Sequence, residues 1–143
     1  MIIEIKNNDT LIIDDFAFKC CIGKKGSKKS KIEGDFSTPK GKFSLGDIFW
    51  RSDRNLMPET ELSCHNIRED MIWCNDINSK HYNKLIKNNL NVRSEKMFRK
   101  DYKYDYLIVI NYNTKKVIKK KGSAIFIHIT KNYKPTAGCI AVT

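Results

Sequence analysis

The sequence predicts a mainly β protein that folds as a single domain over residues 1–143, with one or two short helices. Short apolar runs of strand length follow one another along most of the chain, several of them alternating with polar residues. Asn, Asp and Gly stand between these runs, where they are typical of tight turns. The length of the chain and its hydrophobic content of 41% suit one domain with its own core, and no repeat, linker or coiled-coil pattern divides it.

Three runs near the beginning of the chain are predicted strands: residues 1–6, 10–14 and 16–23 (MIIEIK, TLIID and FAFKCCIG). The Asn and Asp residues between them indicate tight turns. A loop rich in Gly, Ser and Lys follows over 24–42. It leads into residues 43–50 (FSLGDIFW), which are predicted to form the next strand.

The second half of the chain begins with an irregular, polar stretch over 51–78 that contains a few apolar anchors. Residues 79–89 (SKHYNKLIKNN) place three apolar side chains at helical spacing, which predicts a short helix with Asn78 or Ser79 as its cap. The clearest strands follow at residues 104–113, 123–129 and 139–143, and a hairpin-like connection joins the first two of them.

The chain is strongly basic, with 27 Lys and Arg against 16 Asp and Glu and a net charge of +11. Such a charge favours polyanionic partners through long-range attraction. Ten of the Lys residues gather in two segments, 23–31 and 115–122, which read as solvated loops. Nucleic-acid-binding modules add aromatic stacking motifs or a recognition helix to a basic patch. Neither feature occurs in the sequence, so no nucleic-acid partner is expected.

No apolar run approaches the roughly 18 residues that a membrane-spanning helix needs, so no membrane span is expected. The first 16 residues lack the basic start, apolar stretch and small-residue cleavage site of a signal peptide. The sequence therefore leaves two possibilities: the protein acts in the cytoplasm, or its export signal is not part of this chain.

The predicted strand 123–129 presents His128 on a defined face. Because side chains alternate along a strand, His128 shares its face with Ala124 and Phe126, while three Ile side chains occupy the other face. The Ile face looks like the core. We therefore expect His128 on a face that is less buried.

A loop with bends at Pro135 and Gly138 then returns the chain and can bring Cys139 beside His128. A nearby imidazole shifts a Cys from thiol towards thiolate, which is the nucleophilic form. Gly138 would allow a sharp bend and let a substrate approach N–H groups that stabilise an oxyanion. Spacing alone leaves another interpretation open, in which Cys139 is a small buried hydrophobic residue.

Metal binding is a further alternative, because the chain has five Cys residues. No C-x-x-C pair occurs, and the only loose group of possible zinc ligands is Cys64, His65, Cys74 and His81. The odd number of Cys residues leaves at least one of them without a disulfide partner in the chain.

Two segments together resemble the L,D-transpeptidase catalytic domain, also called the YkuD-like domain. GDFSTPKGKF (34–43) is similar to the family's T-P-x-G-x-F signature, and IFIH followed by PTAGCIAV is similar to its His and [S/T]-x-G-C motif. The order and separation of the segments also fit. Further similarity to a small-protein subgroup extends the resemblance from about residue 18 to residue 143.

The resemblance implies a mainly β domain of two packed mixed sheets, with a Cys nucleophile and no metal or organic cofactor. Matched residue by residue, Cys139 falls on the nucleophile and His128 on the general base and acid. The backbone carbonyl of Ile129 would orient the imidazole. Gly138 and the N–H of Cys139 would lie at the oxyanion hole, and Thr136 takes the Ser/Thr position of the motif.

The implied activity is acyl transfer on peptidoglycan stem peptides through a thioester acyl-enzyme, which an amine of a second stem peptide converts to a 3→3 cross-link. The alternatives are an L,D-carboxypeptidase or amidase on the same substrates, and a catalytically inactive basic module of the same fold that binds the cell wall. Arg51 and Arg54 are candidates for binding substrate carboxylates, and Trp73 and Tyr82 for lining the cleft. A buried structural Trp is the other interpretation of Trp73.

The sequence also departs from the family pattern. Many members have His before the motif Gly and Arg shortly after the Cys, where this chain has Ala137 and Ala141. The pattern usually continues with a helix and a further strand, so the resemblance implies a C-terminally shortened form. The substrate implies a location in the periplasm or cell envelope.

Overall fold

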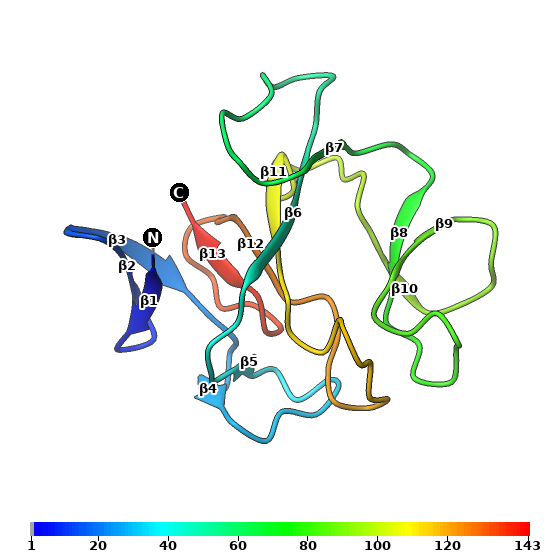
Figure 1. The fold of residues 1–143 in the computed structure, drawn as a ribbon, viewed down its shortest axis with the longest axis horizontal. Coiled ribbons are helices and arrows are strands. Elements are labelled where there is room, and N and C mark those ends of the chain that lie inside the picture. The colour runs from blue at the N-terminus through cyan, green and yellow to red at the C-terminus, as the bar shows by residue number, and fades with distance from the viewer. Residues whose placement is uncertain (1) are drawn as a thin grey trace.

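The computed structural model describes residues 2–143, and within them it contains strands, turns and loops but no helix (Figure 1). The strands are β1 (Ile3–Lys6), β2 (Thr10–Ile13), β3 (Phe16–Cys21), β4 (Ser27–Lys28), β5 (Thr38–Pro39), β6 (Leu45–Trp50), β7 (Cys64–Asn66), β8 (Met71–Cys74), β9 (Leu85–Lys87), β10 (Ser94–Lys96), β11 (Tyr106–Ile110), β12 (Phe126–Ile129) and β13 (Ile140–Val142). None of the described residues belongs to a helix that could cross a membrane.

Eight strands form one mixed sheet in the order β1-β2-β3-β13-β12-β11-β6-β7. Neighbouring strands are antiparallel except for two parallel pairs, β12 with β13 and β6 with β7. Strand β13, red in Figure 1, lies inside the sheet between β3 and β12. Cys139 immediately precedes β13, so this position puts it next to the strand that carries His128.

The large sheet curves, so that apolar side chains from its two halves share one core. Leu11 of β2 belongs to the same buried cluster as Ile110 of β11, although three strands separate β2 from β11 in the sheet order. The Ile side chains at 125 and 127 and Ile140 of β13 belong to it as well. The Ile face predicted to be core is therefore buried.

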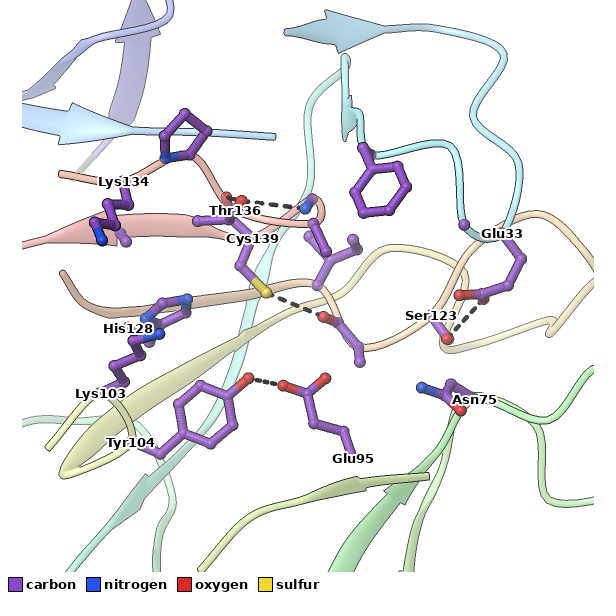
Figure 2. A pocket seen from close by; sticks show the side chains of 18 of the residues that line it. Glu33, Asn75, Glu95, Lys103, Tyr104, Ser123, His128, Lys134, Thr136 and Cys139 are labelled. Atoms are coloured by element: carbon purple, nitrogen blue, oxygen red, sulfur yellow. Dashed lines mark hydrogen bonds between the residues drawn. The ribbon is translucent and has the colours of Figure 1, made fainter. Parts of the chain in front are cut away.

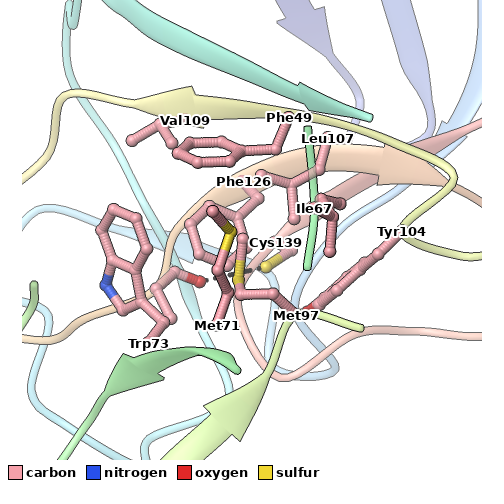
Figure 3. Close-up of a cluster of buried hydrophobic side chains, with 11 residues drawn as sticks. Phe49, Ile67, Met71, Trp73, Met97, Tyr104, Leu107, Val109, Phe126 and Cys139 are labelled. Atoms are coloured by element: carbon pink, nitrogen blue, oxygen red, sulfur yellow. Dashed lines mark hydrogen bonds between the residues drawn. The ribbon is translucent and has the colours of Figure 1, made fainter. Parts of the chain in front are cut away.

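The other face of the large sheet packs against a three-stranded antiparallel sheet with the order β10-β8-β9. Both sheets contribute to this second core, which contains Phe49, Ile67, Met71, Trp73, Met97, Tyr104, Leu107, Val109, Ala124, Phe126 and Cys139 (Figure 3). Phe126 is 0% exposed there, and the rings of Trp73 and Tyr104 meet its ring edge to face.

The second core corrects the expectation for the face that carries His128. Because the smaller sheet covers this face, Phe126 and Ala124 are core residues, and His128 itself is only 9% exposed. Both faces of β12 are therefore buried. The continuous apolar run around His128 is typical of a strand that is covered on both faces.

The mainly β architecture with packed sheets is confirmed, but the helix predicted over 79–89 does not form. The segment makes turns and then β9, which pairs with β8. Asn83 has a φ of 57°, in the left-handed region that a helix cannot continue, and its N–H donates to the carbonyl of Cys74 at 2.8 Å. The stretch 51–78, predicted to be irregular, also contains β7 and the fully buried β8.

Candidate active site

Cys139 stands at the end of a tight turn that Thr136 holds closed. The hydroxyl of Thr136 donates to the carbonyl oxygen of Cys139 at 2.6 Å and accepts the N–H of Gly138 at 3.1 Å. Backbone hydrogen bonds of 2.9 Å attach Thr136 to the segment after β3, with its N–H on the carbonyl of Ile22 and its carbonyl on the N–H of Lys24. The turn before Cys139 is therefore fixed at both ends.

Gly138 is required by the shape of this turn. Its φ is 152°, which L-residues rarely adopt, and a Cβ would lie 3.0 Å from the carbonyl oxygen of Ser37. The carbonyl of Gly138 accepts a hydrogen bond of 2.8 Å from the hydroxyl of Thr38, which in turn accepts the N–H of Gly23 at 2.9 Å. Thr38 belongs to the T-P-x-G-x-F segment, so this distant motif holds the turn that precedes Cys139.

A buried ion pair lies beside the same turn. Lys31 is 3% exposed, and its ammonium group lies 2.8 Å from Asp35, which also pairs with Lys28 at 2.8 Å. Burial raises the pKa of the Asp35 carboxyl. Hydrogen bonds from two backbone N–H groups and from both ammonium groups outweigh burial and hold that pKa well below its usual range.

His128 is oriented by its own strand. Its Nδ1 lies 2.9 Å from the carbonyl oxygen of Ile129. Because a carbonyl oxygen can only accept, Nδ1 carries the proton in this contact, and in the neutral ring Nε2 is the free basic atom. Burial lowers the pKa of His128, the carbonyl of Ile129 acts in the opposite direction, and the charges of Lys103 and Arg99 lower the pKa further. The imidazole is therefore neutral near pH 7 and able to accept a proton.

Cys139 and His128 both line one cavity of about 570 Å³ (Figure 2). The parallel pairing of β12 with β13 sets His128 opposite Ala141, two positions after Cys139. The ring of Tyr104 forms part of the same wall and meets the imidazole with ring centroids 5.3 Å apart. The structure thus brings together the two residues that spacing and strand alternation had paired.

The thiol of Cys139 is held as a neutral group. It donates to the carbonyl oxygen of Ala124 at 3.2 Å. Burial raises the pKa of Cys139 well above its usual range, and the negative charge of Glu95 raises it further, while the N–H of Phe126 and the charge of Lys31 act in the opposite direction. The free protein therefore holds a thiol and a neutral imidazole in one cavity, and a thiolate forms only when a proton leaves.

One wall of the cavity is acidic. The carboxylate of Glu33 accepts hydrogen bonds from Tyr82 at 2.5 Å and from Ser123 at 2.7 Å. Glu95 of β10 accepts the hydroxyl of Tyr104 in a short hydrogen bond. Burial raises the pKa of the Glu95 carboxyl, and the negative charge of Glu33 raises it further, against the opposing effects of Tyr104 and Arg99.

Basic side chains line another part of the cavity. Lys103, Lys131 and Lys134 belong to this part, and Figure 2 shows Lys103 and Lys134 on the same side of the cavity as His128. Arg99 also contributes, held by a two-fold hydrogen bond to Asp101 at 2.9 and 2.7 Å. The cavity therefore offers cations near the imidazole and carboxylates on a different wall.

Arg51 and Arg54, the predicted carboxylate-binding residues, do not line this cavity. Arg51 is buried, pairs with Asp53 at 2.7 Å, stacks over Phe98 and donates to the carbonyl of Arg99. Arg54 bonds Asp105 and three backbone carbonyls at 99–101. Both side chains thus hold the loop that carries Arg99, Lys103 and Tyr104 into the cavity.

Trp73 and Tyr82, the predicted cleft residues, are also absent from the cavity lining. Trp73 is a buried core residue whose Nε1 donates to Asn83 at 2.9 Å, and the same amide oxygen accepts the N–H of Ala124. Tyr82 is 1% exposed; its hydroxyl donates to Glu33 and accepts the N–H of Gly122. These two aromatic residues support residues of the cavity wall from behind.

The residues that the sequence did not single out are Lys31, Glu33, Glu95, Arg99, Lys103 and Tyr104, all of which line the cavity. They come from loops and from two different sheets, and no local pattern joins them. Among residues 2–143 no three His, Cys, Asp or Glu side chains are arranged to hold a metal ion. The residues of the zinc alternative therefore form no such group, and His65 pairs with Asp47.

Comparison with known proteins gives one family. The family model named YkuD, described as the L,D-transpeptidase catalytic domain, matches residues 2–143, which is nearly the whole chain. No curated protein and no solved structure matches the chain.

Proposed function

The chain belongs to the L,D-transpeptidase catalytic domain (YkuD) family, and on this premise we propose that it is a cysteine-dependent transpeptidase of peptidoglycan stem peptides. Residues 1–143 act in this proposal as one catalytic domain, with Cys139 as nucleophile and His128 as general base and acid. The site of action is the cell envelope, where the implied substrate lies.

In the first half-reaction the thiol of Cys139 exchanges the carbonyl of Ala124 for Nε2 of His128 and transfers its proton there. The sulfur attacks the carbonyl carbon at the L-centre of the third stem residue. The C–N bond to the terminal D-residue then breaks, and the imidazolium returns the proton to the departing amine. A thioester on Cys139 remains.

The oxyanion formed during attack needs a hydrogen-bond donor. The N–H of Gly138 already donates to Thr136, so we assign the role to the N–H of Cys139. Thr136 and Gly138 act here by fixing the direction of that N–H, since they form the turn that ends at Cys139.

In the second half-reaction an amine of another stem peptide attacks the thioester. His128 takes the proton that the amine loses and gives it to the departing sulfur, which restores the thiol. With water as the attacking group the same steps yield an L,D-carboxypeptidase, so the balance between the two activities depends on which nucleophile reaches the thioester.

The observation that carries the proposal is the orientation of His128. Its Nδ1 is occupied by the carbonyl of Ile129, so the neutral ring has one basic atom left, on a residue that lines the same cavity as Cys139. Burial also keeps the ring neutral by lowering its pKa. A base in this state is what removal of a proton from a neutral thiol requires.

Mass spectrometry of the protein incubated with a carbapenem and, separately, with a tetrapeptide stem tests the proposal. We expect a covalent adduct on Cys139, release of the terminal D-residue, and formation of a cross-linked dimer. Cys139→Ala should abolish the adduct and His128→Ala should slow it, whereas Cys64→Ala, which removes a partly exposed thiol outside the cavity, should leave it unchanged. A folded wild-type protein without an adduct would contradict the proposal.

A further inference from the structure

Two carboxylates in the cavity have no counter-ion. Glu33 and Glu95 both line the cavity that contains Cys139, yet neither forms an ion pair with any residue in 2–143. The chain contains 27 Lys and Arg against 16 Asp and Glu, so cations are abundant. Both side chains are partly buried, and a carboxylate without an ion-pair partner becomes more costly as burial removes the water that stabilises its charge.

The cations closest to this wall are engaged elsewhere. Lys31 pairs with Asp35 at 2.8 Å, and Arg99 is held by Asp101. Arg93 lines the cavity, but its exposed side chain forms no ion pair with Glu33 or Glu95. The two carboxylates therefore face the cavity without an ion pair, and only the charge of Arg99, which acts on Glu95, partly offsets theirs.

The carboxylates of Glu33 and Glu95 are held in place by hydrogen bonds that they accept. Tyr82 donates to Glu33. Figure 2 shows the bonds from Ser123 to Glu33 and from Tyr104 to Glu95. A third acceptor adjoins them, because the amide oxygen of Asn75, which also lines the cavity, is buried and has no hydrogen-bond partner. An ammonium group supplies what this wall lacks, since it carries one positive charge and three N–H donors.

We propose that Glu33 and Glu95 form an ammonium subsite, which binds the side-chain amine of the diamino acid whose carbonyl Cys139 attacks. The assignment rests on the proposed function. Lys103, Lys131 and Lys134, on the part of the wall near His128, then remain for the carboxylate of the departing D-residue. The cavity thus separates the two charges of a stem peptide onto different walls.

Occupation of the subsite also acts on the nucleophile. The negative charge of Glu95 opposes formation of a thiolate at Cys139, and Tyr104 lies against both residues. A bound ammonium group offsets that charge, so proton transfer from Cys139 to His128 becomes easier when the correct substrate is present. Glu95 is in this sense a specificity residue that couples recognition of the amine to activation of the thiol.

Binding of an unreactive ligand tests the subsite without any turnover. The probe is the tripeptide L-alanyl-γ-D-glutamyl-meso-diaminopimelate, which lacks the departing residue, and its control is the same peptide acetylated on the side-chain amine. We expect the wild type to bind the free amine at least about tenfold more tightly, the size of one charge-assisted hydrogen bond. Glu95→Gln and Glu33→Gln should each remove most of this preference, and Lys96→Gln, at an exposed neighbouring position on β10, should retain it.

Alkylation of Cys139 by iodoacetamide, read peptide by peptide, provides the second measurement. We expect Glu95→Gln to increase the rate at pH 8 several-fold, while the fully buried Cys74 stays unmodified in a folded variant. If Glu95→Gln does not fold, Glu33→Gln still reports on the preference for the free amine. Equal affinity of the wild type for both peptides, no binding of the free-amine peptide, or a preference that survives both substitutions would overturn the subsite. A wild type that prefers the free amine but forms no acyl-enzyme would instead contradict only the proposed catalysis.

Discussion

The thiol of Cys139 donates to the carbonyl oxygen of Ala124 at 3.2 Å, and not to the imidazole of His128. Ala124 has a φ of 52°, in the left-handed region, and its N–H is held by the side chain of Asn83 at 3.0 Å. The backbone that accepts the thiol is therefore itself fixed by a core network. The resting nucleophile is protonated, so the reaction needs a base that removes its proton.

Acyl-enzyme formation should depend on the neutral form of His128. Burial lowers the pKa of His128 below its usual value of 6.5, so protonation of the imidazole, and loss of the base, occurs only in more acidic solution. We expect the rate of adduct formation with a carbapenem to fall as the pH drops through a midpoint below 6.5, and to change little from that midpoint up to neutral pH. A midpoint above 6.5 would contradict a buried neutral base.

Gly138→Ala should destabilise the protein and slow acylation. The added Cβ would lie 3.0 Å from the carbonyl of Ser37, on a backbone with a φ of 152°. We expect a loss of about 1–3 kcal/mol in the free energy of unfolding, measured by urea denaturation.

Gly26→Ala is the matched control, because Gly26 also has a positive φ, of 74°, but only a side-chain atom 3.6 Å from the added Cβ. It should cost about 1 kcal/mol through backbone strain and leave acylation of Cys139 unchanged. Equal losses of unfolding free energy in the two variants would mean that crowding at the Cys139 turn does not add to the destabilisation.

Thr38→Val should be more damaging than Thr38→Ser. The hydroxyl of Thr38 joins the N–H of Gly23 to the carbonyl of Gly138, and valine leaves both groups without a partner. We expect a loss of about 2–4 kcal/mol for valine and less than about 1 kcal/mol for serine, which keeps the hydroxyl. Acylation of Cys139 should slow in the valine variant only. If both variants react like the wild type, Thr38 does not position the nucleophile turn.

Asp35→Asn should lower stability at neutral pH and lose this effect in acid. The folded pKa of Asp35 lies below its unfolded value near 4. Its contribution is therefore fully present above about pH 4 and disappears as the pH falls towards the folded pKa. The difference in unfolding free energy between wild type and variant should be largest at pH 7 and shrink at pH 3.

Most of the strands could be predicted because their signals are local. The apolar run of β12 and the Gly-containing turn before Cys139 lie within one short segment, so the sequence could place Cys139 and His128 on one cavity. Alternation over β12 gave the wrong exposure for His128, because the smaller sheet covers its face. The helix predicted over 79–89 failed because three apolar residues at helical spacing also suit a turn that closes onto β8. Strand β8 was missed because its four residues are all buried, and such a short apolar run shows no alternation.

The walls of the cavity could not be predicted from the sequence. Glu33 lies in a Lys-rich loop and Glu95 in a short strand of the smaller sheet, where charged residues ordinarily face solvent. Glu33 and Glu95 line the same cavity only because different parts of the fold pack together. The spacing of residues along the chain does not reveal that packing. The same is true of Arg51 and Arg54, whose charge suggested substrate binding but whose partners are Asp53 and Asp105.

The interior position of β13 has a consequence for how the protein matures. The sheet cannot close between β3 and β12 until β13 has been synthesised, and the Thr38–Gly138 bond joins positions 100 residues apart. Folding dominated by such distant contacts is slow. A partly unfolded chain thus carries Cys139 without its turn, its imidazole or its cavity, so the proposed nucleophile becomes reactive only when the fold is complete.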